Sequence, residues 1–334
     1  MKVITRRSVL KLGLASLLTA RVAMAQSPAE WPSRPVRFLI PFPPGGGGDT
    51  VARAVAEKAA DIFRQPVIVE NRTGGNAVIA ASAVAQASPD GYTCLWDGNN
   101  HLSNRTLIKD VPFDYRSAFA PVSLTARFPQ VLAVRQDFPA GTLDEFLAYA
   151  RANPGKVSCG TPPSGGMGHL ALELLQRRAD VKLIHTPYRG GPEATRDVMG
   201  GQIDAVLLTT STIRPALQVN KARLLAITSA QRSPLYPEVP TIAERYPGYD
   251  MDDWNGLFVP AATPEAIIGR INAVVAQALR DPAVNARMVP LGTVLVATTP
   301  AEFGVWLAKQ REVIEKIIRD ANITLSSVSP TPRA

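Results

Sequence analysis

Short apolar runs alternate with longer amphipathic stretches along the chain from Val36 onwards. The apolar runs are rich in β-branched residues and are bounded by Gly, Pro, Asn or Asp, a pattern that predicts strands. The stretches between them carry apolar residues at helical spacing. We therefore predict α/β units around largely parallel sheets. The predicted strands are residues 36–41, 67–71, 92–96, 157–160, 181–185, 203–208 and 223–229. The predicted helices include residues 77–87, 142–152, 169–179, 191–200, 264–281 and 300–321.

The length of 334 residues is sufficient for two domains. Cys94 and Cys159 each lie in a predicted strand, and we assign these strands to different domains. A crosslink between them would hinder relative domain motion, so we predict two separate buried thiols. Thr142 and Glu145 have the spacing of a capping box, which predicts the start of one helix.

The first 25 residues have the features of an export signal. A basic front precedes a short apolar segment, and Ala23-Met24-Ala25 forms an A-x-A cleavage site. The segment Thr5–Lys11, TRRSVLK, resembles a twin-arginine signal, and an ordinary secretion signal with two arginines is the alternative. Either signal predicts a periplasmic or extracellular protein, with cleavage after Ala25. We expect the C-terminal residues 324–334 to be disordered.

The net charge of the chain changes when this signal is removed. The full chain carries a formal charge of +8, and the signal contains five basic residues and no acid, which leaves +3. No basic run interleaved with aromatic residues is present, so nucleic acid is not a predicted partner.

The segment 41–50, PFPPGGGGDT, lies between a predicted strand and a predicted helix. A helix that begins there presents unpaired N–H groups and the positive end of its dipole, and glycines let an anion approach these groups closely. The Gly-Lys-Ser/Thr sequence of a Walker loop is missing, and so is the third glycine of a dinucleotide fingerprint. A small carboxylate fits the remaining pattern, with Asp49 capping the helix. A tight turn that binds nothing is the alternative.

Three further junctions repeat this order of strand, glycine-containing loop and helix, at residues 71–80, 158–175 and 185–198. Loops at the carboxyl ends of parallel strands meet at a crevice where ligands bind. Two facing sets of such loops predict a cleft that holds one small ligand from both sides.

Signals for catalysis or metal binding are weaker. The three histidines form no metal-binding pair, and no C-x-x-C or G-x-S-x-G motif is present. We predict neither metal nor cofactor. Ser164, His169 and Asp49 are the candidates if the protein is instead a secreted α/β enzyme acting on small carboxylated substrates. We interpret His169 as a hydrogen-bonding residue at a helix start.

A set of motifs at consistent spacing, from about Trp31 to Ile323, resembles the Bug (TctC-like) family of receptors for tripartite tricarboxylate transporters. The motifs are WPSRPVRFLIPFPPGGGGDTVARAVAEK, VIVENRTGGNAVIAA, SPDGYTCL, FDYRSAFAPVSL, HTPYRGGPEATRDVMGGQIDAV, EVPTIAE and WNGLFVPAATP.

The resemblance implies a two-domain periplasmic-binding-protein fold of the type II-like, Venus-flytrap kind. Domain 1 would comprise residues 26–128 and 252–323, and domain 2 residues 129–251. Such a monomeric receptor closes around a small organic acid and docks on a small and a large membrane subunit. A receptor that feeds a membrane sensor is the alternative within the same fold.

The resemblance also implies a set of ligand-binding residues. One group lies in domain 1 and the other in domain 2, where Tyr188 and Arg189 are added as a cleft wall and a cation. The implied residues are Phe42, Gly46, Gly47, Gly48, Asp49, Thr161, Ser164, Gly165, Gly166, Met167, His169, Tyr188 and Arg189. Met167 departs from the Ser or Thr that often stands near this position, and a thioether is only a weak acceptor. This departure favours a bulkier or more apolar ligand, such as an aromatic acid.

Overall fold

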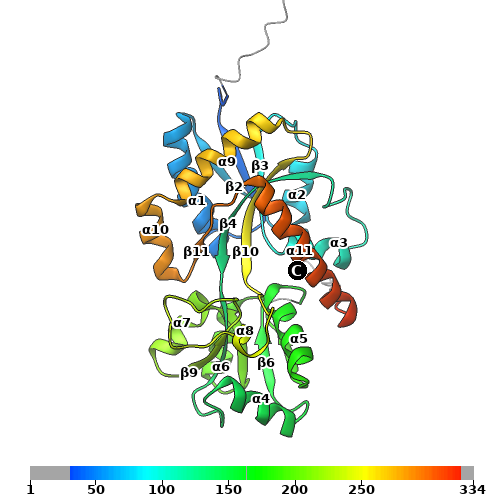
Figure 1. The fold of residues 1–334 in the computed structure, drawn as a ribbon, viewed down its shortest axis with the longest axis vertical. Helices are drawn as coiled ribbons and strands as arrows, with labels where there is room; N and C mark the ends of the chain where they lie inside the picture. Colours follow the sequence, from blue (N-terminus) through cyan, green and yellow to red (C-terminus); the bar gives the residue numbers. More distant parts are fainter. Residues whose placement is uncertain (1–30, 163, 325–334) are drawn as a thin grey trace, which may run out of the picture.

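The protein forms two α/β lobes, one above the other in Figure 1. A computed structural model describes residues 31–162 and 164–324. The predicted export signal, residues 1–25, and the predicted tail beyond residue 324 lie outside the described residues.

The first lobe is built on a six-stranded sheet in the order β11-β4-β10-β3-β1-β2. Strand β1 pairs in parallel with β2 and β3, whereas β10 pairs antiparallel with β3 and β4. The strands are β1 Val36–Ile40, β2 Val67–Asn71, β3 Thr93–Asp97, β4 Phe119–Phe128, β10 Asp253–Pro260 and β11 Val294–Leu295.

The second lobe repeats this arrangement in a five-stranded sheet, β7-β6-β8-β5-β9. Strand β6 pairs in parallel with β7 and β8, and β5 pairs antiparallel with β8 and β9. The strands are β5 Gln130–Arg135, β6 Ser158–Thr161, β7 Ile184–Pro187, β8 Ala205–Thr209 and β9 Ala222–Ile227. Strands β1 and β6 therefore hold equivalent places, and so do the glycine loops that follow them.

The helices cover both sheets and bury their apolar faces against them (Figure 1). The first lobe carries α1 Gly47–Phe63, α2 Val78–Ala85, α3 Asn100–Leu107, α9 Glu265–Leu279, α10 Pro282–Met288, α11 Pro300–Asp320 and the short 3-10 helices η2 Gly75–Ala77 and η3 Val289–Leu291. The second carries α4 Leu143–Ala152, α5 Met167–Ala179, α6 Gly191–Met199, α7 Thr210–Gln218 and α8 Ile242–Arg245. The predicted two-lobe α/β architecture is confirmed, in sheets that mix parallel and antiparallel pairs.

Two local predictions are also confirmed. Cys94 in β3 and Cys159 in β6 are buried, free thiols in different sheets. Burial raises the pKa of the Cys159 thiol to about 12, which keeps it protonated. Thr142 and Glu145 form the complete capping box at the start of α4.

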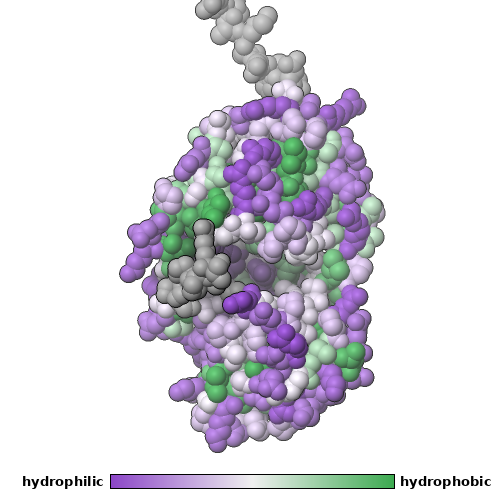
Figure 2. Space-filling model, turned by 180° about the vertical axis from the view of Figure 1, so that it is seen from behind, coloured by the Kyte–Doolittle hydropathy of each residue, from purple (hydrophilic) through white to green (hydrophobic). Residues whose placement is uncertain are grey.

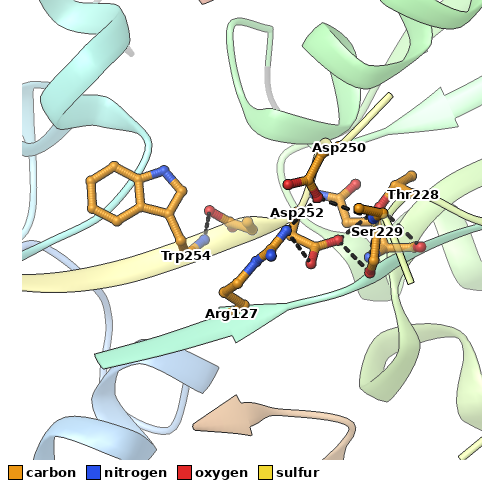
Figure 3. A network of polar contacts seen from close by, with 9 residues as sticks. Arg127, Thr228, Ser229, Asp250, Asp252 and Trp254 are labelled. Atoms are coloured by element: carbon orange, nitrogen blue, oxygen red, sulfur yellow. Dashed lines mark hydrogen bonds and ion pairs between the residues drawn. The ribbon is translucent and has the colours of Figure 1, made fainter. Parts of the chain in front are cut away.

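The chain crosses between the sheets where β4 gives way to β5 and again between β9 and β10. A polar network joins these crossings (Figure 3). The Arg127 guanidinium contacts Asp250 and lies 3.0 Å from Asp252 Oδ2, while Ser229 Oγ donates to Asp252 Oδ1 at 2.7 Å. Burial raises the pKa of Asp252 to about 6, although Arg127 and Ser229 both act to lower it. The two crossings form the hinge between the lobes, and the guanidinium of Arg127 links them by lying between the carboxylates of Asp250 and Asp252.

The lobes also touch away from the hinge. Arg214 Nη1 donates to the Pro290 carbonyl at 2.9 Å, which links α7 to η3. An ion pair of 2.8 Å between Arg177 and Asp320 links α5 to the end of α11. These two contacts, between α7 and η3 and between α5 and α11, link the lobes in addition to the chain crossings.

Candidate functional site

A cleft of about 890 Å³ separates the start of α1 in one lobe from the starts of α6 and α7 in the other. The molecular surface is hollowed between the lobes in Figure 2. The volume lies within the roughly 300–1,000 Å³ of small-molecule sites. The lining residues are Pro43, Pro44, Gly45, Gly46, Gly47, Gly191, Pro192, Thr195, Arg196, Met199, Ser211, Thr212 and Pro215.

Gly45, Gly48 and Gly46 in the first loop differ in whether the backbone conformation or the packing requires a glycine. Gly45 has a φ of +82°, a conformation that favours glycine. A Cβ on Gly48 would lie 2.6 Å from the Phe42 ring and 2.8 Å from Asn255 Oδ1, so Gly48 is required by packing. Gly46 has an ordinary φ of −69° and room for a side chain, and it lines the cleft. Neither backbone strain nor packing therefore accounts for a glycine at position 46.

Asp49 holds this loop together from within. Its buried carboxylate accepts hydrogen bonds from the Gly45 amide, Arg53 Nε and Asn71 Nδ2, each at 2.9 Å. Burial acts to raise the pKa of Asp49, but these hydrogen bonds outweigh it and the pKa is lowered. Asp49 is therefore an anion whose oxygens are already occupied. Phe42 contributes its carbonyl, which accepts from Asn71 Nδ2 at 2.9 Å.

The first turn of α1 leaves donors free. The amides of Gly47, Gly48 and Asp49 have no acceptor among the described residues, and no side chain caps this helix. Such amides and the helix dipole together favour an anion at this position. The first loop can therefore solvate a carboxylate with backbone donors alone.

The opposite wall consists of two more helix starts. A Cβ on Gly191 would lie 2.3 Å from Thr212 Cγ2, so this glycine allows α6 and α7 to begin side by side. Thr195 Oγ1 lies 3.0 Å from the Gly191 carbonyl and 3.2 Å from the Thr212 carbonyl, which ties the two starts together. Neither start has a side-chain cap. By contrast, α4 and α11, whose starts do not line the cleft, have complete capping boxes.

The second glycine loop, residues 161–167, is fixed by two stacked histidines. The Gly165 amide donates to His169 Nδ1 at 3.1 Å, and the His169 ring stacks on His185 with centroids 3.9 Å apart. His185 Nε2 lies 2.8 Å from Thr161 Oγ1. Burial, and for His169 also the neighbouring His185, lowers the pKa of both rings to about 4. Both imidazoles are neutral at pH 7.

This loop also reaches the other lobe. Asn99 Nδ2 lies 3.4 Å from the Gly165 carbonyl, and both residues are buried. Gly166 is the N-cap of α5 and has no side-chain cap. Gly165 and Thr161 were both predicted to bind ligand. The Gly165 amide has an acceptor within the protein, His169 Nδ1, and the Thr161 hydroxyl has the Pro162 carbonyl and His185 Nε2 as partners.

The geometry does not assemble a nucleophile with a base. Among the described residues, no hydrogen bond joins Ser164 to His169, and His169 Nδ1 already accepts from the Gly165 amide. No cluster of three or more His, Cys, Asp or Glu in the part of the chain described could hold a metal ion. No helix in residues 31–162 or 164–324 combines the length and apolar character needed to cross a bilayer.

The remaining predicted residues are dispersed. Met167 is buried in the core cluster that connects α5 with α11, so its thioether packs rather than faces solvent. The Tyr188 hydroxyl donates to Asp197 Oδ2 at 2.9 Å. Arg189 is exposed and forms no ion pair with another described residue. Of the predicted residues, Gly46 and Gly47 line the cleft between α1 and α6.

Four polar lining residues were not predicted: Thr195, Arg196, Ser211 and Thr212. Their signal in the sequence is position, because Ser211 and Thr212 follow directly after the apolar strand β8. Arg196 lies within a helix that was predicted, but the sequence pattern does not show which face of that helix meets the other lobe.

Comparison with known proteins agrees with this architecture. A protein from Pseudomonas sp. (strain P51), described as "UPF0065 protein in tcbD-tcbE intergenic region", is 36% identical over 317 residues, 94% of each chain. The structure described as "R. palustris Rpa4515 with adipate" is 30% identical with a TM-score of 0.76, covering 88% of this chain and 100% of that one. The structure "MatC (Rpa3494) from Rhodopseudomonas palustris with bound malate" is 30% identical with a TM-score of 0.72, covering 86% and 100%.

The family model described as "Tripartite tricarboxylate transporter family receptor" matches residues 51–323. This match spans both lobes and includes the starts of α6 and α7, which line the cleft. The chain belongs to the TctC family of tripartite tricarboxylate transporter receptors, which are periplasmic solute-binding proteins.

Proposed function

We propose that this protein is an exported receptor that captures a small organic carboxylate between its lobes and performs no chemistry on it. The observation that carries this proposal is the set of unpartnered amides of Gly47, Gly48 and Asp49 at the start of α1, whose first residue, Gly47, lines the interlobe cleft. The closed receptor would then deliver its ligand to the small and large membrane subunits of a tripartite transporter. The protein would act in the periplasm as a monomer, after removal of residues 1–25.

Two considerations support this proposal. Structures of two relatives at 30% identity are described with adipate and with malate, and both ligands are carboxylates. Closure also requires that the ligand bind the closed form more tightly than the open one. A cleft walled by helix starts from both lobes meets this requirement, because a ligand gains donors from the second wall only when the lobes close.

The test is a binding screen on the mature protein, residues 26–334. Thermal shift assays identify stabilising compounds among mono-, di- and tricarboxylates, including aromatic acids, and isothermal titration calorimetry measures the affinity. We expect one carboxylate class to bind stoichiometrically and to be recovered unchanged by NMR. Turnover of the compound, or equal indifference to all carboxylates, would contradict the proposal.

Delivery to a transporter needs a separate experiment. Uptake of the labelled ligand by cells that possess or lack the receptor tests this step directly. Uptake that does not depend on a receptor with proven affinity would point to a membrane sensor as its partner.

A further inference from the structure

Arg196 is the only ionisable side chain among the described residues that line the cleft. The other lining residues are prolines, glycines, a methionine, a serine and threonines, and none of them is acidic. A wall of this composition is apolar apart from one positive charge and several hydroxyls. The charge lies on α6, in the lobe opposite the α1 amides.

The surroundings of Arg196 leave most of its guanidinium unused. Its Nε lies 3.3 Å from Asp197 Oδ1, and Asp197 Oδ2 accepts from the Tyr188 hydroxyl at 2.9 Å. Neither terminal nitrogen has an acceptor among the described residues, and Glu193, one turn earlier, forms no ion pair with it. The side chain is 75% exposed. An exposed ion pair of this kind contributes little to stability, so stability does not explain an arginine here.

The position of Asp197 explains how the side chain is held. Tyr188 fixes one oxygen of Asp197, and the other oxygen faces Nε of Arg196. This arrangement orients the guanidinium by its inner nitrogen and leaves the fork free. Two parallel N–H groups of an arginine fork match a carboxylate or a phosphate in geometry and charge.

We propose that Arg196 binds a second anionic group of the ligand, while the first carboxylate occupies the amides of Gly47 and Gly48. This inference rests on the proposed function. It makes Arg196 the residue that distinguishes a dianion from a monoanion. The apolar segment between the two acidic groups of the dianion would lie along Pro43, Pro192 and Met199. Because the two anchors belong to different lobes, only a dianion uses both charges to hold the lobes closed.

The test compares adipate with hexanoate, which has the same chain length and one carboxylate fewer. Calorimetry on the mature wild-type protein should give at least tenfold tighter binding of adipate, the effect expected when a charge-assisted hydrogen-bonded pair is lost. Arg196→Gln should remove this preference by weakening the binding of adipate at least tenfold more than that of hexanoate. Arg196→Lys should retain part of it, because lysine keeps the charge and lacks the fork.

Arg178→Gln is the matched control, since it removes one exposed arginine from α5 in the same lobe outside the cleft. It should leave both affinities unchanged. If Arg196→Gln keeps the preference for adipate, the inference is wrong and the proposed function stands. If the wild type prefers hexanoate, Arg196 is not an anion anchor. If neither acid binds and the wider screen finds no carboxylate, the proposed function itself fails.

Discussion

Replacing Gly46 with serine should make the protein more stable and a poorer receptor. Gly46 is the N-cap of α1, with φ −69° and ψ 164°, a conformation that a serine N-cap adopts without strain. A serine hydroxyl there would accept from the Gly48 or Asp49 amide, which have no acceptor among the described residues. It would occupy the donors that we assign to the ligand carboxylate.

The two effects can be estimated separately. Replacing glycine at a compatible position stabilises by about 0.4–1 kcal/mol through the unfolded chain, and a serine cap adds a few tenths. The sum is about 1 kcal/mol, which raises Tm by about 2 °C for a chain of this size. Loss of one charge-assisted hydrogen bond costs about 1.5–3 kcal/mol of binding, or roughly ten- to hundredfold in Kd.

Differential scanning calorimetry and titration with the best ligand of the screen measure both quantities on one sample. Gly46→Ala is the matched control, because it adds a Cβ without an acceptor. A poorer N-cap then offsets the gain in the unfolded chain, so its Tm should stay near that of the wild type. A Gly46→Ser variant that is more stable and still binds like the wild type would refute the assignment of these amides to the ligand.

Three further predictions concern closure and pH. Arg214→Ala removes the bond to the Pro290 carbonyl, so we expect a larger radius of gyration by small-angle scattering and about fivefold weaker ligand binding. His169 and His185 have folded pKa values of about 4, below the ordinary value of 6.5, so their contribution to stability is lost as pH falls from about 6.5 through 4, as measured by urea unfolding. Asp252, with a pKa of about 6, contributes in the opposite sense, since its stabilisation is present below pH 3.8 and lost as pH rises through 6. Asp252→Asn should therefore lose stability on acidification more steeply than the wild type, and an unchanged slope would contradict the raised pKa.

Much of the fold follows from periodicity, but four of its strands did not. The predicted parallel strands and longer helices are all present, because buried strands and amphipathic helices leave strong patterns. Strands β4, β5, β10 and β11 were not predicted. Strands β5 and β10 each enter their sheet directly after the chain has crossed from the other lobe, so their pairing depends on residues distant in sequence, as for Val131 with Leu208 and Asn255 with Ala126. Helix α7 was missed because Pro215 and several β-branched residues weaken its helical pattern.

The sequence predicted part of the first-lobe wall of the candidate site, Gly46 and Gly47. It did not predict the residues that line the second-lobe wall. The glycine loop of α1 is recognisable because four glycines are costly and need a reason. Tertiary contacts decide why a glycine is needed at a given position. Gly48, for example, packs against Asn255, about two hundred residues away in sequence. Arg196 could not be distinguished from Arg189 by sequence, since the choice depends on which face of α6 meets the first lobe.

The distribution of helix caps connects these observations to function. The same chain closes the starts of α4, α8 and α11 with complete capping boxes, so side-chain capping is available to this sequence. The starts of α1, α6 and α7, which line the cleft, have no side-chain cap although each cap would stabilise the fold by about 1 kcal/mol. The starts of α2, α3, α5 and α9 also lack a side-chain cap, so it is their position at the cleft that distinguishes α1, α6 and α7. Three uncapped starts in one cleft leave their first-turn amides without a side-chain acceptor until an anion enters. On the proposed function, a bound anion would recover this missing stability as binding free energy only when both lobes contribute, which is the differential affinity that closure requires.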